Sequence, residues 1–168
     1  MSLSMYKATV PVFISMLTNL SAMLKKADHY AESKKIDPSV LMNARLAPDM
    51  LPIVRQIQIA TDSAKGCAAR LANMEIPSFP DTETTFAQLH ERLHKTISFL
   101  KSVTASQVDG SEERSISLKI GGQDLNFKGE EFALHFALPN FYFHVSMAYA
   151  ILRHNGLDLG KKDYLGSK

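Results

Sequence analysis

Apolar residues recur at three- and four-residue steps in four long stretches, the pattern of helices with one buried face. These stretches cover about residues 5–27, 48–72, 84–103 and 129–154. Prolines between residues 48 and 52 favour a start of the second helix in that region, because proline is tolerated near a helix start. We expect Pro139 to break the last helical region and Asn155-Gly156 to end it. Short connections favour antiparallel neighbours in the bundle, although one crossing connection is compatible with the pattern.

The apolar period changes to two between the third and fourth stretches. Ile116, Leu118 and Ile120 alternate before Gly121-Gly122, and Leu125 and Phe127 alternate after it. A glycine pair between alternating segments predicts a tight hairpin. In that register Leu118 faces Leu125 and Ile116 faces Phe127, which places the apolar side chains on one side. The expected fold is therefore mainly all-α, a single domain over residues 1–168 with a short β-hairpin before the last helix.

Three local features refine this picture. Leu41 and Met42 follow Asp37-Pro38-Ser39, and we expect them to fold back over the core. Ile59 lies nearly opposite the main apolar stripe of the second helix, so that helix is either central in the bundle or part of a subunit interface. Asp81 and Thr82 are the N-cap candidates for the third helix.

Composition and charge narrow the function classes. The 168 residues are 45% hydrophobic and 21% charged, with a formal net charge of +2. The basic residues form scattered pairs, so we expect no nucleic-acid partner. No apolar run reaches the roughly 20 residues that span a bilayer, and the start lacks the features of a signal peptide. We therefore expect a cytoplasmic protein that does not enter a membrane. Cys67 is the single cysteine, which excludes an internal disulfide and a cysteine-built zinc site.

His90-Glu91-Arg92-Leu93-His94 matches the H-E-x-x-H pattern of zinc peptidases. Two histidines four apart on a helix share a face and could bind one metal. Counting 100° per residue, however, His90 and His94 lie on the flank of the third helix. No third ligand is evident, so we expect a partly solvated flank.

Asn140 and His144 are four apart in the last helix, on the face that continues through Met147, Ala148 and Ile151. Polar groups on a core-facing stripe need hydrogen-bond partners, because an unpaired buried polar group is costly. His144 could simply donate to a backbone carbonyl or a buried water. Alternatively, the two side chains form one wall of a ligand pocket.

Several runs resemble an uncharacterised branch of the DinB/YfiT-like superfamily. The runs are Pro139-Asn-Phe-Tyr-Phe-His144, residues 148–156, residues 159–166, residues 43–50 and residues 54–62. The resemblance implies a DinB-like four-helix bundle, often dimeric. In metal-binding members, a histidine on the second helix and an H-x-x-x-H on the fourth hold a divalent metal. Some members transfer low-molecular-weight thiols to electrophiles, and others, including this branch, have no assigned activity.

The resemblance carries over to three positions of this sequence. His144 matches the second histidine of the fourth-helix pair, and Asn140 stands where the first would be. Gln58 best matches the second-helix histidine, with a slip of one or two positions left open. Amides are weak ligands for zinc or nickel compared with imidazole. We therefore expect no tightly bound divalent metal, with His144 as a weak candidate ligand.

Three functional interpretations follow. The leading one is a small molecule bound in a cleft lined by the last helix, with Gln58, Asn140 and His144 as ligand-binding residues. His144 is then the candidate catalytic group, a general base near neutral pH. The first alternative is a divalent-metal-dependent enzyme of the thiol-transferase type. The second is a non-enzymatic homodimeric interaction module that uses the doubly apolar second helix.

Overall fold

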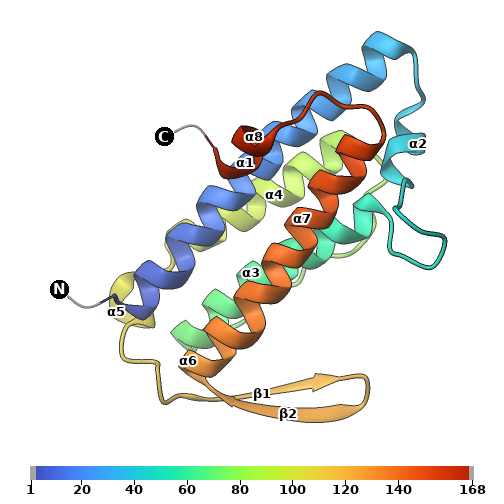
Figure 1. The fold of residues 1–168 in the computed structure, drawn as a ribbon. Coiled ribbons are helices and arrows are strands. Elements are labelled where there is room, and N and C mark those ends of the chain that lie inside the picture. Colours follow the sequence, from blue (N-terminus) through green and yellow to red (C-terminus); the bar gives the residue numbers. More distant parts are fainter. Residues whose placement is uncertain (1–2, 167–168) are drawn as a thin grey trace.

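Four long helices form a bundle in the computed structural model, which describes residues 3–166 (Figure 1). They are α1 (Met5–Lys34), α3 (Ile53–Ala72), α4 (Phe86–Ser102) and α7 (Leu138–His154). α3 packs against α4 and α7, and α1 packs against the same two helices on the other side. The mainly helical fold with a small hairpin agrees with the prediction from the sequence.

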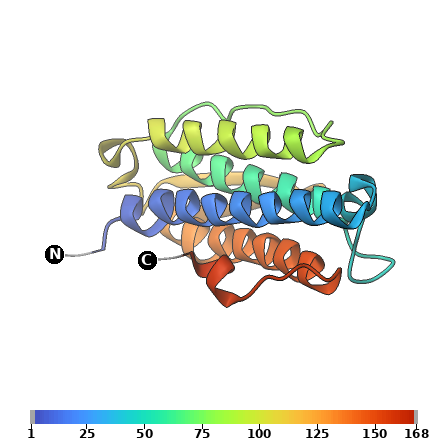
Figure 2. The ribbon, with the colours of Figure 1, turned by 90° about the horizontal axis from the view of Figure 1, so that it is seen from above.

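α3 and α4 run in the same direction, opposite to α1 and α7 (Figures 1 and 2). This arrangement follows from residues 73–85, which cross the length of the bundle between the end of α3 and the start of α4. The bundle thus has the one crossing connection that the sequence left open.

α1 extends about two turns beyond the predicted end at residue 27, and Lys35 closes it in the left-handed conformation (φ 54°). Its apolar stripe lies in the core, where Val10, Phe13 and Leu17 are fully buried. By length and composition alone this helix could span a membrane. Here its stripe instead packs against the other helices of the bundle.

The connection after α1 contains the short helix α2 (Pro38–Met42), whose N-cap Asp37 accepts a hydrogen bond from the backbone of Ser39. Leu41 and Met42 are buried, which confirms that this segment folds over the core. α3 is the central helix, in contact with α1, α4 and α7. Ile59, on its second apolar side, is half-buried.

α4 begins after Thr85, whose hydroxyl accepts from the backbone N–H of Gln88 in a capping box. The prediction that Asp81 or Thr82 caps this helix is therefore wrong. The Asp81 carboxylate instead forms ion pairs with Arg55 and Arg92. A short helix, α5 (Ala105–Val108), then leads into the hairpin.

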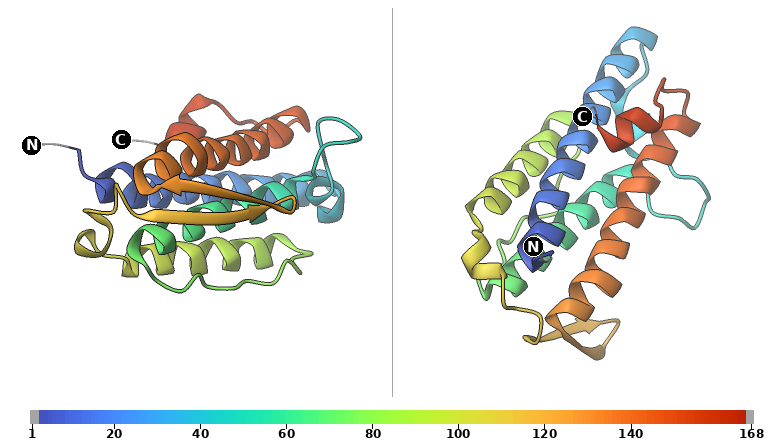
Figure 3. Two further views of the ribbon diagram at one scale, coloured as in Figure 1. Left: turned by 90° about the horizontal axis from the view of Figure 1, so that it is seen from below. Right: turned by 60° about the vertical axis from the view of Figure 1, so that its left-hand side comes forward.

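The hairpin pairs β1 (Ser115–Ile120) with β2 (Gln123–Lys128) in the predicted register, with Leu118 opposite Leu125 and Ile116 opposite Phe127. Gly121 and Gly122 take positive φ values of 57° and 83°, which glycine adopts without strain. The hairpin lies at the end of the bundle where α3 ends (Figure 3).

The last helical region continues without a break from α6 (Gly129–Glu131) through the π-helical segment η1 (Phe132–Ala137) into α7. The expected break at Pro139 is therefore wrong. Proline removes one N–H and crowds the carbonyl four residues earlier, and the wider π-turn directly before α7 accommodates both effects. The tail then folds back as α8 (Lys161–Leu165), where Asp163 forms an ion pair with Lys26 of α1 at 2.7 Å.

Candidate functional site

His144 on α7 faces α3, where its Nδ1 lies 2.8 Å from Oε1 of Gln56. The Nε2 amide group of Gln56 donates to the carbonyl of Leu51 at 3.0 Å, so Oε1 is the atom left to accept from His144. This arrangement assigns the proton of the neutral imidazole to Nδ1. The lone pair is then on Nε2.

The His144 side chain is 8% exposed, and burial lowers its pKa from the usual value. The imidazole is therefore neutral at pH 7. No hydrogen bond to Nε2 is recorded within residues 3–166. In the same residues, Ser111 Oγ is the one fully buried side-chain polar atom without a partner, so Nε2 keeps some contact with solvent. A neutral imidazole with a free Nε2 can accept a proton or a hydrogen bond.

Asn140 lies one turn before His144 and donates to Oγ of Ser63 at 2.8 Å. Ser63 and Gln56 are seven residues apart on α3, which places them on one face of that helix. Asn140 and His144 thus both point toward α3, as the sequence predicts.

Gln58 points to a different part of the bundle. Its Nε2 donates to Glu83 at 2.7 Å, and its Oε1 accepts from Arg55 at 2.6 Å. At 100° per residue, Gln58 lies about 200° around α3 from Gln56. The structure brings His144 to Gln56, two positions before the residue inferred from the resemblance, and Asn140 to Ser63. The signal in the sequence was the spacing of Gln56, three residues after Ile53 in the apolar stripe.

The donor set beside His144 does not fit a transition-metal ion. Within residues 3–166 no group of three or more His, Cys, Asp or Glu side chains could hold a metal. The groups around His144 are amides, which bind zinc and nickel weakly. His90, from the peptidase-like motif, lies 3.2 Å from Ser21 Oγ, and His94 is exposed. The predicted position of these two histidines on a solvated helix flank is confirmed.

A cleft of about 270 Å³ opens beside Asn140, between α3, η1, the start of α7 and β1. His144 is not among its lining residues. The lining residues are Asp62, Ser63, Cys67, Arg70, Leu118, Lys119, Ile120, Phe132, Phe136, Ala137 and Asn140. One wall is therefore apolar and aromatic, and the other carries hydroxyl, amide and charged groups.

Arg70 and Cys67 contribute very differently to this cleft. The Arg70 guanidinium donates to the carbonyl of Gly66 at 3.1 Å and lies over the ring of Phe132, 5.9 Å from its centroid. Burial raises the pKa of the Cys67 thiol to about 12. The thiol is therefore protonated and unsuited to act as a nucleophile.

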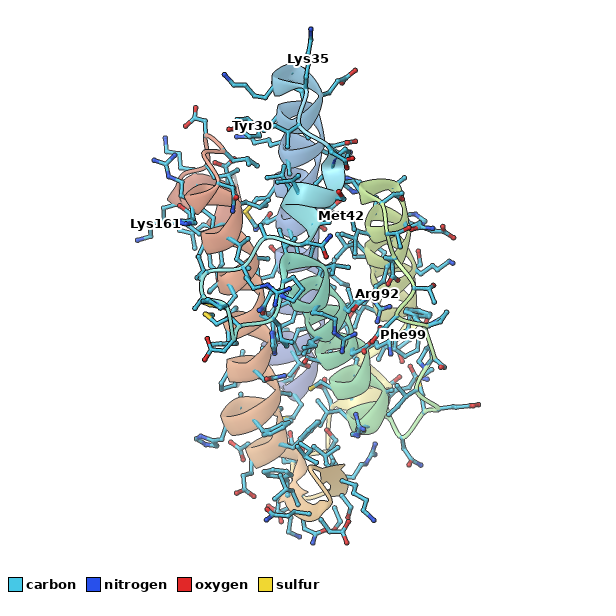
Figure 4. All side chains as sticks on the ribbon, turned by 90° about the vertical axis from the view of Figure 1, so that its right-hand side faces the viewer. Tyr30, Lys35, Met42, Arg92, Phe99 and Lys161 are labelled. Carbon is cyan, nitrogen blue, oxygen red and sulfur yellow. The ribbon has the colours of Figure 1, made fainter. Side chains whose placement is uncertain are left out.

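A second polar group, the Arg92 cluster, joins α3, α4 and the crossing connection. Arg92 lies between α3 and α4 (Figure 4) and is 2% exposed. Its guanidinium contacts Asp62 at 2.8 Å, Asp81 at 3.0 Å and Glu83 at 2.9 Å. Lys65 also contacts Asp62, at 2.9 Å. Sequence reasoning missed this cluster, although Arg92 falls three residues after Leu89 on the inner side of α4.

Comparison with known proteins finds similarity to a protein family and to solved structures. The family described as a domain of unknown function, DUF1993, matches residues 5–165. The crystal structure of a DinB family member protein from Shewanella denitrificans is similar, with 42% sequence identity and a TM-score of 0.87. The match covers 97% of this chain and 92% of that chain. No curated protein matches the sequence.

Proposed function

The chain belongs to the DUF1993 family and has the DinB-like fold, and we propose that it binds a small molecule in the cleft beside Asn140. One observation carries this proposal: the cleft has an aromatic wall on one side and several polar groups on the other. Small-molecule sites are usually built in this way. The volume of about 270 Å³ corresponds to roughly nine liquid water molecules, which limits the ligand to a small one.

Asn140 and Ser63 are the polar residues that would orient this ligand. They already bind each other, so an incoming polar group can join an ordered pair at little cost in side-chain entropy. His144 lies one turn further along α7, about 6 Å away by helix rise. His144 is our candidate for a general base, and it could act only on a ligand that extends from the cleft along α7.

The test is a thermal-shift screen with small aromatic and polar fragments on the wild type, Asn140→Ala and Asn19→Ala. A ligand at ten times its Kd stabilises the folded state by about 1.4 kcal/mol. For a domain of this size that raises Tm by roughly 3–6 °C. Asn19 is a matched control, because it is also half-buried and hydrogen-bonded, in its case to the Tyr164 carbonyl.

We expect active fragments to stabilise the wild type and Asn19→Ala alike, and Asn140→Ala less. The proposal fails if no fragment shifts Tm, or if every shift is the same in Asn140→Ala.

We further propose that this function needs no tightly bound divalent metal. The support is the donor set beside His144, a single imidazole among amides. Metal analysis of protein purified without an affinity tag should find far less than one ion per chain. Stoichiometric metal that is lost in His144→Ala would instead favour the thiol-transferase type of enzyme.

A homodimeric interaction module is the second candidate function. Phe143, whose ring packs against His144 at 5.2 Å, is 52% exposed, and Leu51, whose carbonyl binds Gln56, is 45% exposed. These large exposed apolar side chains favour a contact between two copies of the chain near His144. Light scattering should then give a dimer mass that Phe143→Ser reduces to that of a monomer. A monomeric wild type would exclude this function. In either case we expect the protein in the cytoplasm.

A further inference from the structure

Arg70 is a half-buried cation of the cleft, and among the residues that the structure describes it has no acidic partner. Within residues 3–166 no Asp or Glu oxygen lies within 4.0 Å of its guanidinium, whereas Arg55, Lys65 and Arg92 each contact a carboxylate. In the described part of the chain, the Arg70 side chain donates a single hydrogen bond, to the Gly66 carbonyl. A guanidinium has five N–H donors in a planar fork, so most of its donors are free to bind a ligand.

The charges around Arg70 leave the cleft positive. Asp62 is the acidic residue in the lining, and its Oδ1 already contacts Arg92 and Lys65. Lys119, the other cation of the lining, is exposed on β1. Burial lowers the pKa of Arg70, but an arginine side chain remains charged near neutral pH. A half-buried positive charge of this kind favours an anion in its vicinity.

Gly66 gives the guanidinium its position. A Cβ atom at Gly66 would lie 2.7 Å from an Nη atom of Arg70, and it would meet no other residue within 4 Å. Glycine is unfavourable inside a helix, so its presence in the middle of α3 has a cost in stability. Here the missing side chain lets Arg70 fold back one turn against its own helix and beside Phe132.

From these contacts we propose that the ligand of the cleft is a small organic acid, whose carboxylate binds Arg70 and whose apolar part lies against Phe132 and Phe136. This inference rests on the proposed function and names its ligand class. The planar fork of arginine matches a carboxylate with two parallel hydrogen bonds. The aromatic wall suits a flat apolar body such as a phenyl ring.

Benzoate and benzamide are the probes, because they have nearly the same shape and differ in charge. Their Kd values can be measured by ligand-observed NMR on the full chain. We expect benzoate to bind at least about tenfold more tightly than benzamide, as a charge-assisted pair implies. Arg70→Gln should remove this preference.

Two further variants separate positioning by Arg70 from general charge effects. Gly66→Ala keeps the arginine but displaces its guanidinium, so it should weaken benzoate severalfold while Tm stays constant or rises. Lys119→Gln removes the other cation of the lining and should change the Kd less than twofold. A Tm measurement on each variant shows that the fold is intact.

The inference is overturned if benzoate and benzamide bind the wild type equally, or if Lys119→Gln weakens benzoate as much as Arg70→Gln does. If only neutral fragments bind and Asn140→Ala weakens them, the organic-acid ligand is wrong and the proposed function stands. If no probe or fragment binds at all, both are wrong.

Discussion

Replacing Arg92 by methionine tests whether the Arg92 cluster anchors the crossing connection to the bundle. Methionine has a similar length and no charge, so the main loss is electrostatic. Arg92 is 2% exposed, and its removal leaves Asp62, Asp81 and Glu83 without their shared cation. Removing one partner of a buried ion pair costs about 3–5 kcal/mol, because the remaining charge stays buried and uncompensated.

The exposure of the three acids decides where in this range the variant should fall. The side chains of Asp62 and Asp81 are 43% and 35% exposed, so water screens them once Arg92 is gone. Glu83 is 10% exposed, and its carboxylate would keep the hydrogen bond from Gln58 but lose its cation. We therefore expect a loss of about 3 kcal/mol, at the lower end of the range. For a domain of this size Tm falls by about 6–12 °C.

Urea and thermal unfolding of Arg92→Met, Glu83→Gln and the double variant measure this effect. In the double variant no buried carboxylate is left uncompensated, so its loss should be smaller than the sum of the single losses by about 1 kcal/mol or more. Lys95→Met is the matched control on the same helix. Lys95 pairs with Glu91 at 2.6 Å on the surface, so its loss should stay within about 0.5 kcal/mol. An Arg92→Met variant no less stable than Lys95→Met would refute the anchoring role.

Three other predictions follow from single residues. Because burial lowers the folded-state pKa of His144, the unfolded chain protonates first as pH falls below about 6.5. The unfolding free energy should then decrease by at most about 1.4 kcal/mol per pH unit until the folded imidazole also protonates, and His144→Gln should flatten this slope in urea titrations. Gly129→Ala should destabilise the fold by about 2 kcal/mol or more, since its Cβ would lie 1.9 Å from the Ser111 carbonyl oxygen. Gly160→Ala, where nothing lies within 4 Å, should leave Tm nearly unchanged, and equal effects of the two substitutions would contradict the steric argument. Iodoacetamide should modify Cys67 slowly in the native protein at pH 8 and rapidly in urea, as mass spectrometry can show, because the native thiol has a pKa of about 12. Equal rates in both states would contradict its burial.

The helices and strands whose apolar residues recur with a clear period were predictable from the sequence. The hairpin register follows from alternation on both sides of Gly121-Gly122, since a shift by one residue would expose every apolar side chain. The start of α4 was not predictable, because Asp81, Thr82 and Thr85 are all good N-caps within five positions. In the structure Thr85 caps the helix through its capping box with Gln88, while the Asp81 carboxylate pairs with Arg92.

The candidate site was predictable on α7 and less so on α3. The inward direction of Asn140 and His144 follows from the helical period. Choosing between Gln56 and Gln58 requires the rotation of α3 about its axis, since both glutamines border apolar positions and both are buried. Nothing in the sequence indicated the role of Arg70, because its place in the cleft depends on β1 (Ser115–Ile120) and η1 (Phe132–Ala137), which come much later in the chain.

Asp62 belongs both to the cleft beside Asn140 and to the Arg92 cluster. It lines the cleft, and the same carboxylate contacts Arg92 and Lys65. Without those two cations, Asp62 would give the cleft a negative charge that offsets Arg70. Under these two proposals Arg92 would have two effects: it would anchor the crossing connection and also keep the cleft favourable for an anion. An organic acid bound to Arg70 would depend on Arg92 although it never touches it, and Asp62→Asn should make binding independent of that arginine.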